Sequence, residues 1–280
     1  MKGKYYVTTA IDYTNDVVHI GHSYQKILAD VLARYHRSLG EDVFFLTGTD
    51  EHGVKIVRAA EEADVPVNKF VDKNTKVFQD LLSALNISND YFIRTSDKEI
   101  HWPGAQKMWR ALVDSGDIYK KKYEGLYCVG CEAFLKEKDL VDGKCPDHQT
   151  TPETIEEENY FFRFSKYQKP LLKFYKENPN FVIPNFRFNE IRQFVNQGLR
   201  DFSVSRLKSK LPWGVPVPND PDQVMYVWLD ALSNYITVLG YPDREGWQEY
   251  WPADVQVIGK GILRFHAGIW PAILLGLGLQ

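Results

Sequence analysis

The sequence contains only three cysteines among its 280 residues. They are Cys128, Cys131 and Cys145, an odd number crowded into one short stretch. Disulfide frameworks pair their cysteines and belong to oxidising compartments, so this pattern indicates a reducing compartment. We therefore expect a cytoplasmic protein.

Long hydrophobic runs are also lacking. The most apolar stretch, residues 262–279, carries Arg264, His266 and Pro271 in its first half, which disfavours a membrane span. A buried helix is expected there, and no membrane partner. The N-terminal run ahead of Asp12 is too short and too polar for a signal peptide.

Neither sign of charge is in strong excess, because the formal net charge is −3. This value excludes a protein that binds nucleic acid over its whole surface, although a local basic patch is compatible with it. A content of 44% hydrophobic and 25% charged residues is typical of globular proteins. The length is sufficient for roughly two domains with a sizeable core.

The first elements follow from hydrophobic spacing. Residues 4–10 are predicted as a strand, 21–39 as a helix ended by Gly40, and 42–46 as a second, buried strand. The helical spacing comes from apolar residues at every third or fourth position: Ile27, Leu28, Val31, Leu32, Tyr35 and Leu39. A strand, a helix and a strand in this order predict a parallel sheet with a right-handed crossover.

Similar patterns continue along the chain. They predict helices at 54–63, 67–85, 98–115, 171–175, 190–199, 230–238 and from 262 onward, and strands at 90–94, 160–164, 224–228 and 255–258. Because the alternation of strand and helix returns after residue 222, we expect one nucleotide-binding α/β sheet that is interrupted by an insertion. The expected division is 1–115 for the first half of the sheet domain, 116–222 for the insertion, and 223–280 for the second half.

The stretch His19-Ile20-Gly21-His22 lies where the helix 21–39 begins. Free backbone N–H groups and the helix dipole attract phosphate at such a point, and the two imidazoles add donors. Gly21 would allow a ligand to approach the backbone closely. The alternative is a pair of surface histidines near a helix N-cap. Residues 48–53, Gly-Thr-Asp-Glu-His-Gly, fall at the same carboxyl edge of the sheet, which predicts one shared ligand site.

A second pattern is Cys128-x2-Cys131, thirteen residues, then Cys145-x2-His148. Three thiolates and one imidazole favour tetrahedral Zn²⁺, and four protein ligands make a closed, structural site. Gly130 and Gly143 are expected to supply tight turns. The alternative is four unrelated residues. The knuckle would occupy about residues 126–149. Just upstream, Lys120 to Lys122 are read either as a tRNA contact or as a solvated face.

The ordered motifs resemble the methionyl-tRNA synthetases, a family of class I aminoacyl-tRNA synthetases. The resemblance rests on sequences at residues 10–15, 19–22, 48–53, the knuckle, 226–231 (Tyr-Val-Trp-Leu-Asp-Ala), 258–260 (Ile-Gly-Lys) and 265–271. It implies a Rossmann-type catalytic domain with a zinc-bearing insertion. It also implies that methionine and ATP, with Mg²⁺, form methionyl-adenylate, and that the methionyl group passes to the 3′-terminal adenosine of tRNA(Met).

The resemblance also implies roles for individual residues. His19, His22 and Arg206 would be catalytic, and Gly21, Gly259 and Lys260 would join His19 and His22 in binding ATP. The methionine pocket would be formed by Ala10, Ile11, Tyr13, Asp50, Trp228, Tyr235 and His266, with Asp50 pairing with the ammonium group. Three alternatives remain: Asp50 as a helix N-cap, Trp228 and Tyr235 as core packing, and Arg206 as a surface charge.

The sequence departs from the family at Asp12, where proline or an aromatic residue is usual, and at Leu232 and Gly261, the last in place of an aspartate. The family's Lys-Met-Ser-Lys-Ser loop and anticodon-reading helical domain are not among these 280 residues. We therefore expect a fragment with feeble or no activity. The rival readings are a class I synthetase of the leucine, isoleucine, valine or cysteine type, and a catalytically dead methionine-binding fragment.

Overall fold

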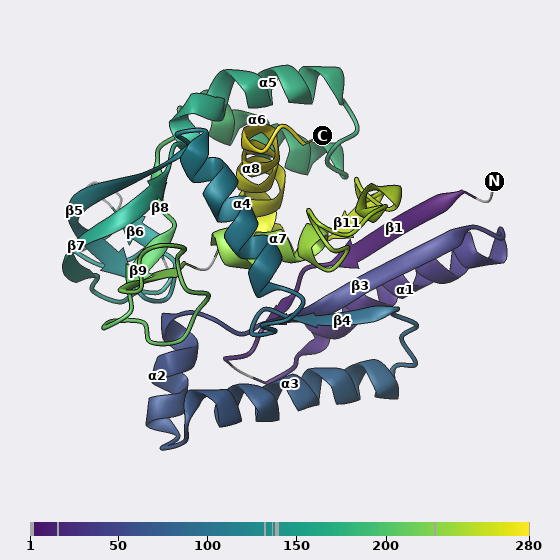
Figure 1. Ribbon diagram of the computed structural model, residues 1–280, viewed down its shortest axis with the longest axis horizontal. Coiled ribbons are helices and arrows are strands. Elements are labelled where there is room, and N and C mark those ends of the chain that lie inside the picture. Colours follow the sequence, from purple (N-terminus) through teal and green to yellow (C-terminus); the bar gives the residue numbers. More distant parts are fainter. Residues whose placement is uncertain are drawn as a thin grey trace.

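The computed structural model describes residues 3–15, 17–131, 133–135, 137, 140–226 and 228–279. Two positions of predicted elements, Val227 and Gln280, lie outside the described residues. The main sheet is parallel (Figure 1), and its strands are β1 (Lys4–Thr9), β2 (Asp12–Tyr13), β3 (Asp42–Asp50), β4 (Tyr91–Arg94) and β11 (Val255–Val257). The strand β1 lies between β11 and β3, and β4 pairs with β3. The predicted parallel α/β sheet is thereby confirmed.

The crossover between β1 and β3 is α1 (Ile20–Ser38), as predicted. Two more helices, α2 (Val54–Glu62) and α3 (Val67–Ala84), lead from β3 to β4, and α4 (Trp102–Asp114) follows β4. The helix α4 begins four positions later than the sequence predicts. The side chain of Asp97 accepts the backbone N–H groups of Glu99 and Ile100, at 2.8 and 2.9 Å, and so holds this segment in a turn.

The strands β1 and β2 lie on the same side of β3 but are separated by a bulge. Thr8 is opposite Leu46 and Asp12 is opposite Thr49, so the β1–β2 side holds one extra residue. Thr49 also pairs with Arg94 of β4, which places β2 and β4 on opposite sides of β3. Such bulges redirect side chains near functional sites. The bulge at residues 9–11 turns the chain at the carboxyl edge of the sheet.

The insertion forms an antiparallel sheet beside the parallel one (Figure 1). Its strands are β6 (Ala133–Leu135), β5 (Ile118–Cys128), β7 (Glu153–Phe162) and β8 (Phe202–Ser203), in this spatial order. The helices α5 (Gln168–Glu177) and α6 (Asn185–Asn196) lie between β7 and β8 in the sequence and form the uppermost part of Figure 1. A short η2 (Phe164–Tyr167) precedes α5.

The predicted strand 224–228 is not part of the parallel sheet. Its ordered part, β10 (Gln223–Met225), pairs antiparallel with β9 (Ser205–Leu207). The N–H of Met225 donates to the Val215 carbonyl at 2.7 Å, so β10 is hydrogen-bonded on its other side as well. Sequence spacing could not distinguish these partners, because β9 and Val215 both lie within residues 116–222, the predicted insertion.

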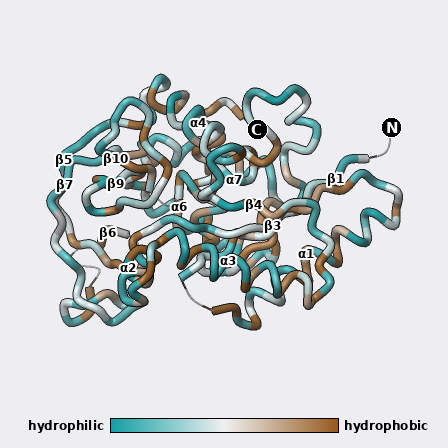
Figure 2. The backbone as a smooth tube through the Cα atoms, turned by 60° about the horizontal axis from the view of Figure 1, so that its bottom comes forward, coloured by the Kyte–Doolittle hydropathy of each residue, from teal (hydrophilic) through white to brown (hydrophobic). Residues whose placement is uncertain are grey.

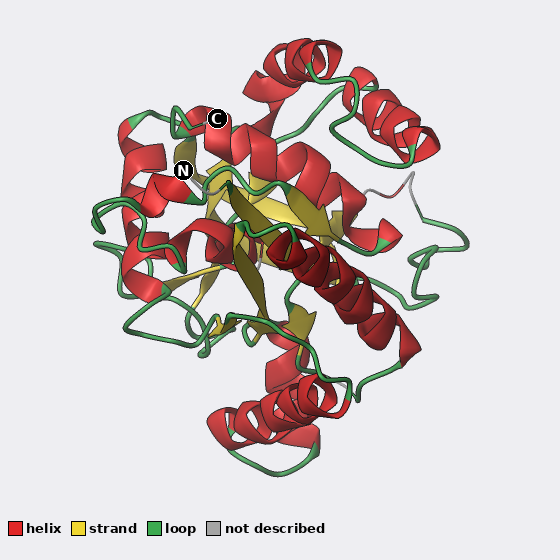
Figure 3. Ribbon diagram, turned by 90° about the vertical axis from the view of Figure 1, so that its right-hand side faces the viewer, coloured by secondary structure: helices red, strands yellow, loops and turns green. Residues whose placement is uncertain are grey.

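The chain then returns to the parallel sheet through α7 (Trp228–Thr237), η3 (Trp247–Glu249) and β11. After β11 come η4 (Lys260–Ile262), a π-helical turn η5 (Phe265–Ile269) and α8 (Trp270–Gly276). Figure 3 shows the helices surrounding the strands of the central sheet. Among the described residues, no helix is both long and apolar enough to cross a membrane.

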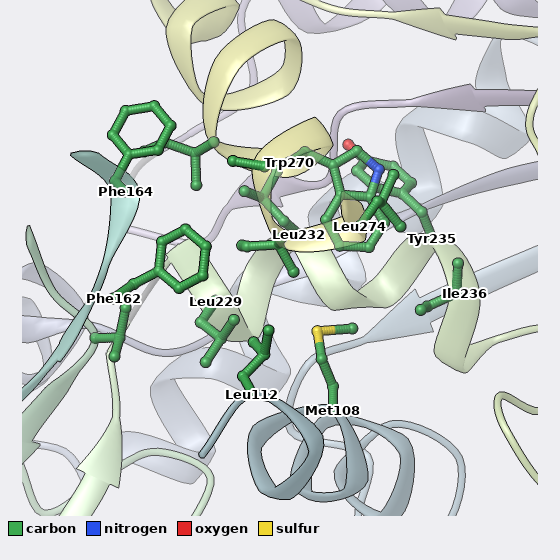
Figure 4. Close-up of a cluster of buried hydrophobic side chains, with 14 of the residues drawn as sticks. Met108, Leu112, Phe162, Phe164, Leu229, Leu232, Tyr235, Ile236, Trp270 and Leu274 are labelled. Carbon is green, nitrogen blue, oxygen red and sulfur yellow. The ribbon is translucent and has the colours of Figure 1, made fainter. Parts of the chain in front are cut away.

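One apolar cluster joins the insertion to the parallel sheet. Figure 4 shows Met108 and Leu112 of α4 directed towards side chains of α7 and α8, with Phe162 and Phe164 alongside. Met108, Leu112 and Phe162 are fully buried. The described residues of the insertion therefore share this core with the sheet domain.

Helix α1 buries a different face from the one its spacing suggests. Large apolar side chains on it are exposed: Ile27 44%, Leu28 40%, Val31 57%, Tyr35 58% and Leu39 59%. The sheet is contacted instead through Ala29 and Ala33, which pack with Tyr5, Val7 and Phe45. Small residues allow the helix to approach the strands closely. Figure 2 shows the hydrophobic positions along α1 as brown segments of the tube.

A substitution of Gly48 in β3 tests how tightly this sheet is packed. A Cβ atom added there would lie 2.0 Å from the Ile93 carbonyl oxygen on β4. Backbone cannot yield as a flexible side chain can, so Gly48→Ala is expected to lower the free energy of unfolding by about 3 kcal/mol or more. Urea denaturation followed by circular dichroism measures this change. Gly268→Ala is the control, since its Cβ would meet Ile191 at an ordinary 3.5 Å; equal destabilisation by both variants would contradict the packing account.

Candidate functional site

A cavity of about 500 Å³ lies where the carboxyl ends of β1 and β3 face α7 and η5. Four elements that are far apart in the sequence contribute to its wall. All the residues predicted for an amino-acid pocket line it: Ala10, Ile11, Tyr13, Asp50, Trp228, Tyr235 and His266. The bulge between β1 and β2 supplies the first two, and β2 supplies Tyr13. The fold thus brings this predicted set together in one place.

His266 and Tyr235 form a polar pair inside this cavity. The Nδ1 atom of His266 lies 3.1 Å from the Ile262 carbonyl, which can only accept, so Nδ1 carries the proton. The Tyr235 hydroxyl then donates to His266 Nε2 across 2.7 Å. Burial lowers the pKa of His266 to about 4, despite the hydrogen bond to Ile262, which raises it. At neutral pH the cavity therefore presents a neutral imidazole.

The apolar wall is built around Trp228. Its ring stacks on Phe265, with ring centroids 3.4 Å apart and an angle of 11° between the planes. Leu232, noted above as a departure, and Ala231 also line the cavity from α7. Phe265 and Ala231 belonged to quoted motifs, but no pattern in the sequence pointed to their contact with the cavity. Tyr235 was predicted either as a pocket residue or as core packing. It lines the cavity and also belongs to the buried core.

Asp50, the last residue of β3, supplies a carboxylate to the cavity and is 7% exposed. Its Oδ1 accepts the backbone N–H of His52 at 3.4 Å, and its carbonyl accepts the N–H of Thr14 at 3.2 Å. The alternative reading of Asp50 as the N-cap of the next helix is wrong, because Gly53 occupies that position. The carboxylate is held at the edge of the sheet and faces the cavity.

Glu51, the next residue, is fully buried and was not singled out from the sequence. Its carboxylate accepts hydrogen bonds from Thr49 at 2.8 Å, Thr75 at 2.6 Å and Arg94 Nε at 2.7 Å, and another from Ser96. These partners come from β3, α3, β4 and the turn after β4. A buried carboxylate with this many donors fixes the backbone that carries Asp50.

Asp230 forms a second buried network. Its two carboxylate oxygens lie 2.6 Å from His52 Nδ1 and 2.7 Å from His101 Nε2, and all three side chains are buried. Burial raises the pKa of Asp230, but the contacts with His52 and His101 outweigh it and lower the value to about 2. The ionised carboxylate ties α7 to the end of β3. Sequence reasoning noted Asp230 only as part of a motif.

The predicted phosphate-binding turn opens α1. Gly21 N–H donates to His19 Nδ1 at 3.1 Å, and His19 N–H donates to His22 Nδ1 at 3.2 Å, so both rings cap the helix. Their centroids are 3.8 Å apart in a stacked arrangement. Because each Nδ1 accepts, the proton of each neutral imidazole is on Nε2, directed away from the cap. His19 is thus the N-cap residue and His22 completes the capping box, which fits the alternative reading. Both rings retain outward donors, and phosphate binding at this turn stays a prediction.

The other predicted nucleotide residues lie in two further cavities. Gly259 and Lys260 line one of about 430 Å³ beside α6 and β11. Arg206 is buried between Tyr127 and Tyr226, with its guanidinium 4.5 Å from each ring centroid and 3.6 Å from Glu157. It lines a separate cavity of about 250 Å³. The alternative of a surface charge is wrong for Arg206, because only 2% of it is exposed.

The four knuckle residues form one cluster, in which their ligand atoms all lie within 4.8 Å of one another. Cys131 Sγ is 3.5 Å from Cys145 Sγ and 3.2 Å from His148 Nδ1. The sulfur separation is far too long for a disulfide, and the cluster could hold a metal ion. Burial raises the pKa of Cys145, but hydrogen bonds with His148 and the other thiols outweigh it and bring the value to about 6.

The two knuckle glycines act differently. Gly143 has a φ of +74°, the conformation that favours glycine in a tight turn, as predicted. Gly130 also lies in a turn, as predicted, and it is needed for space as well, because a Cβ atom there would lie 2.3 Å from the His148 ring. Gly130, Cys131 and His148 also line the 500 Å³ cavity. The cluster therefore borders the same space as Asp50 and Trp228.

A parallel sheet with a helix N-terminus and a cavity at its carboxyl edge defines a nucleotide-binding α/β protein of the Rossmann type. A family model described as "tRNA synthetases class I (M)" matches residues 5–151 and 139–280. The chain belongs to this family.

Individual relatives of the chain support the same family. The chain is 51% identical over 281 residues to the methionine–tRNA ligase of Caldanaerobacter subterraneus subsp. tengcongensis, covering 100% of this chain and 44% of the relative. It is 50% identical over 282 residues to that of Brucella suis biovar 1, covering 99% and 54%. The chain thus spans about half the length of the curated relatives it matches.

Solved structures of a methionyl-tRNA synthetase also match the chain. Mycobacterium tuberculosis methionyl-tRNA synthetase in complex with methionyl-adenylate matches with a TM-score of 0.95 and 48% identity, covering 100% of this chain and 55% of that one. The apo form of the same enzyme matches with a TM-score of 0.85 and 44% identity, covering 100% and 54%. The shape of this chain is nearer to the adenylate complex than to this apo form.

The pKa of His266 predicts how stability changes with pH. Since its value in the folded chain, about 4, lies below the ordinary 6.5, the unfolded chain binds the extra proton between these values. Stability is therefore lost as the pH falls from 6.5 towards 4. Between pH 7 and pH 5, the free energy of unfolding should fall by about 2 kcal/mol less for His266→Gln than for the parent chain. Urea denaturation at both pH values measures it, and equal losses would contradict the assignment.

Proposed function

We propose that this chain is the part of a methionine–tRNA ligase that carries the site at which methionine and ATP are joined as methionyl-adenylate. The observation that carries the proposal is the convergence of the predicted pocket residues, Asp50 and Trp228 among them, on one cavity. The relatives named methionine–tRNA ligase support it, as does the resemblance to the complex with methionyl-adenylate.

In the proposed complex, the Asp50 carboxylate pairs with the methionine ammonium group, a charge-assisted contact. The stacked Trp228 and Phe265 rings lie against the thioether, which is polarisable and suits aromatic surroundings. The His266–Tyr235 pair, whose protons are donated to the Ile262 carbonyl and to His266 Nε2, gives the end of the pocket an uncharged polar surface. A neutral imidazole suits this place, because a charged one would be costly beside the apolar side chain.

ATP is proposed to bind along the start of α1 and towards Gly259 and Lys260. The outward Nε2–H groups of His19 and His22 would donate to phosphate oxygens. A methionine carboxylate oxygen attacks the α-phosphorus, a new P–O bond forms, and the bond to the bridging oxygen breaks as pyrophosphate leaves with the electron pair. No protein nucleophile is required, so positioning and charge stabilisation would provide the catalysis. Mg²⁺ bound with ATP would neutralise triphosphate charge.

Several finer assignments remain proposals. Arg206 is proposed as a catalytic residue near the phosphates, and the methionyl group is proposed to pass to the 3′-terminal adenosine of tRNA(Met). The division at 1–115, 116–222 and 223–280 is supported by the antiparallel sheet that the middle part forms. The expected cytoplasmic location also stays a prediction.

Lys120 is engaged with Asp220 at 2.9 Å, which favours the reading of the run Lys120 to Lys122 as a solvated face.

The cysteine–histidine cluster is proposed to hold one structural Zn²⁺. Three sulfur atoms and one imidazole nitrogen match the donor set of a closed tetrahedral site, and their spacing leaves room for an ion between them. The Zn²⁺ would supply cross-links between β5 and the 145–148 turn. No step of the reaction is assigned to it.

Binding and exchange across amino acids test the proposed function. Methionine should quench or shift the fluorescence of Trp228, whereas leucine, isoleucine, valine and cysteine should not. Methionine-dependent exchange of labelled pyrophosphate into ATP would show full activation chemistry, and we expect it to be feeble or absent for these 280 residues. Exchange with another amino acid would select the rival synthetase type. Methionine binding with little or no exchange is the expected result for a chain that spans about half the length of these ligases. A chain that binds no methionine would contradict the proposal.

A matched pair of variants sharpens this test. Asp50→Asn should weaken methionine binding by about 10- to 100-fold, the usual value of a hydrogen bond to a charged group. Asp80→Asn, on the exposed surface of α3 where Asp80 pairs with Lys76, should leave binding unchanged. An unchanged affinity in Asp50→Asn would remove Asp50 from the ammonium site.

Metal analysis tests the zinc proposal separately. The purified chain should contain about one zinc per molecule, and Cys128→Ser or Cys145→Ser should lose it. Asp147→Asn is the control, because Asp147 lies 3.8 Å from Cys131 Sγ but is not one of the four ligands. A folded chain that never contains metal would refute the site.

A further inference from the structure

A buried ion pair connects α1 to the bulge beside the cavity. Lys26 Nζ lies 2.7 Å from Asp12 Oδ2, and the two side chains are only 1% and 3% exposed. Removing two charges from water is costly, and well-packed apolar residues of similar size are often at least as stable. Stability alone therefore does not explain why this position holds a buried ion pair.

The surroundings of the pair indicate what it holds. Lys26 Nζ also donates to the Ala10 carbonyl at 3.4 Å and to Thr9 Oγ1 at 3.3 Å. The neighbouring Gln25 donates to the Ala10 carbonyl at 3.3 Å and to the Val257 carbonyl at 2.8 Å. The second turn of α1 therefore contacts both the cavity wall at Ala10 and the end of β11, just before Gly259.

We propose that Asp12 and Lys26 are a positioning pair that fixes the Ala10–Ile11 bulge of the methionine cavity against the histidine turn of α1. The pair rests on the proposed function, since it aligns the two sites whose ligands must react. Lys26 lies one helical turn after His22, so the same lysine side chain spans from the proposed nucleotide side to the amino-acid side.

The electrostatics of His22 support this connection. Burial lowers the pKa of His22, the Asp12 carboxylate raises it, and His19 and Lys26 lower it. Apart from His19, the ring that contacts His22 in the described structure is Phe78 on α3, which carries no charge. The pair is thus close enough to influence His22, and its two charges act in opposite directions.

Two variants separate positioning from simple stabilisation. Lys26→Met leaves the Asp12 carboxylate buried and without its cation, so the titration of His22 should change and the melting midpoint should fall by about 6 °C or more. The double change Asp12→Leu with Lys26→Met replaces both charges by apolar groups, so it should fold at least as well as the parent. It nevertheless removes the contacts with Ala10 and Thr9, and methionine binding should weaken by about tenfold.

The measurements are proton NMR titration of the labelled histidines, thermal unfolding, and methionine titration by fluorescence. Arg34→Gln is the control, because it removes an ion pair of 2.7 Å with Asp30 on the same helix, far from His22. It should change neither the His22 titration nor methionine binding. If Lys26→Met does not fold, the double variant decides the question by its methionine affinity.

Each outcome is decisive. A double variant that binds methionine as the parent does would overturn the proposal, as would a Lys26→Met chain whose His22 titrates unchanged. A parent chain that binds no methionine would instead contradict the proposed function, while the His22 titration would still test the contact between the pair and the histidine turn. A changed His22 titration in Lys26→Met, together with weakened methionine binding in the stable double variant, would establish the positioning role.

Discussion

The site depends on the buried Asp230 carboxylate and the two imidazoles that it accepts from. His101 precedes α4, His52 follows β3, and Asp230 is in the first turn of α7, so three segments meet at one negative charge. Without a partner such a charge would be very costly to bury, which makes the arrangement specific. Because Asp230 fixes α7 against the end of β3, Trp228 faces Asp50 across one cavity.

The same edge of the sheet contains two more buried carboxylates, Glu51 with Arg94 and Asp12 with Lys26. Glu51 links the end of β3 to β4, and Asp12 links β2 to α1. Apolar packing alone tolerates small shifts of side chains, whereas a buried charge loses its compensation when its partner moves. The cavity wall is therefore positioned by ionic contacts, while the apolar cluster around Met108 supplies most of the burial.

The sequence was informative where signals are local. Alternating and helical spacing predicted β1, α1 and β3, and the Cys-x2-Cys and Cys-x2-His spacings predicted a cluster that the fold assembles. The buried partners were not predictable, because Asp230 and His101 are separated by 129 positions. The exposed face of α1 was also missed. Spacing shows that a helix has an apolar face, but it does not show that Ala29 and Ala33 give the closer fit to the sheet.

The insertion is more closely tied to the cavity than its separate sheet suggests. Phe162 and Phe164 pack in the same core as α7 and α8, and His148 and Cys131 line the cavity that Asp50 and Trp228 also line. A closed metal site performs no chemistry of its own, yet it fixes the loops that carry its ligands. Since those loops form part of the cavity wall, a metal held there would set the shape of the proposed amino-acid site. The proposed metal would then be structural in coordination and, through that wall, would contribute to recognition.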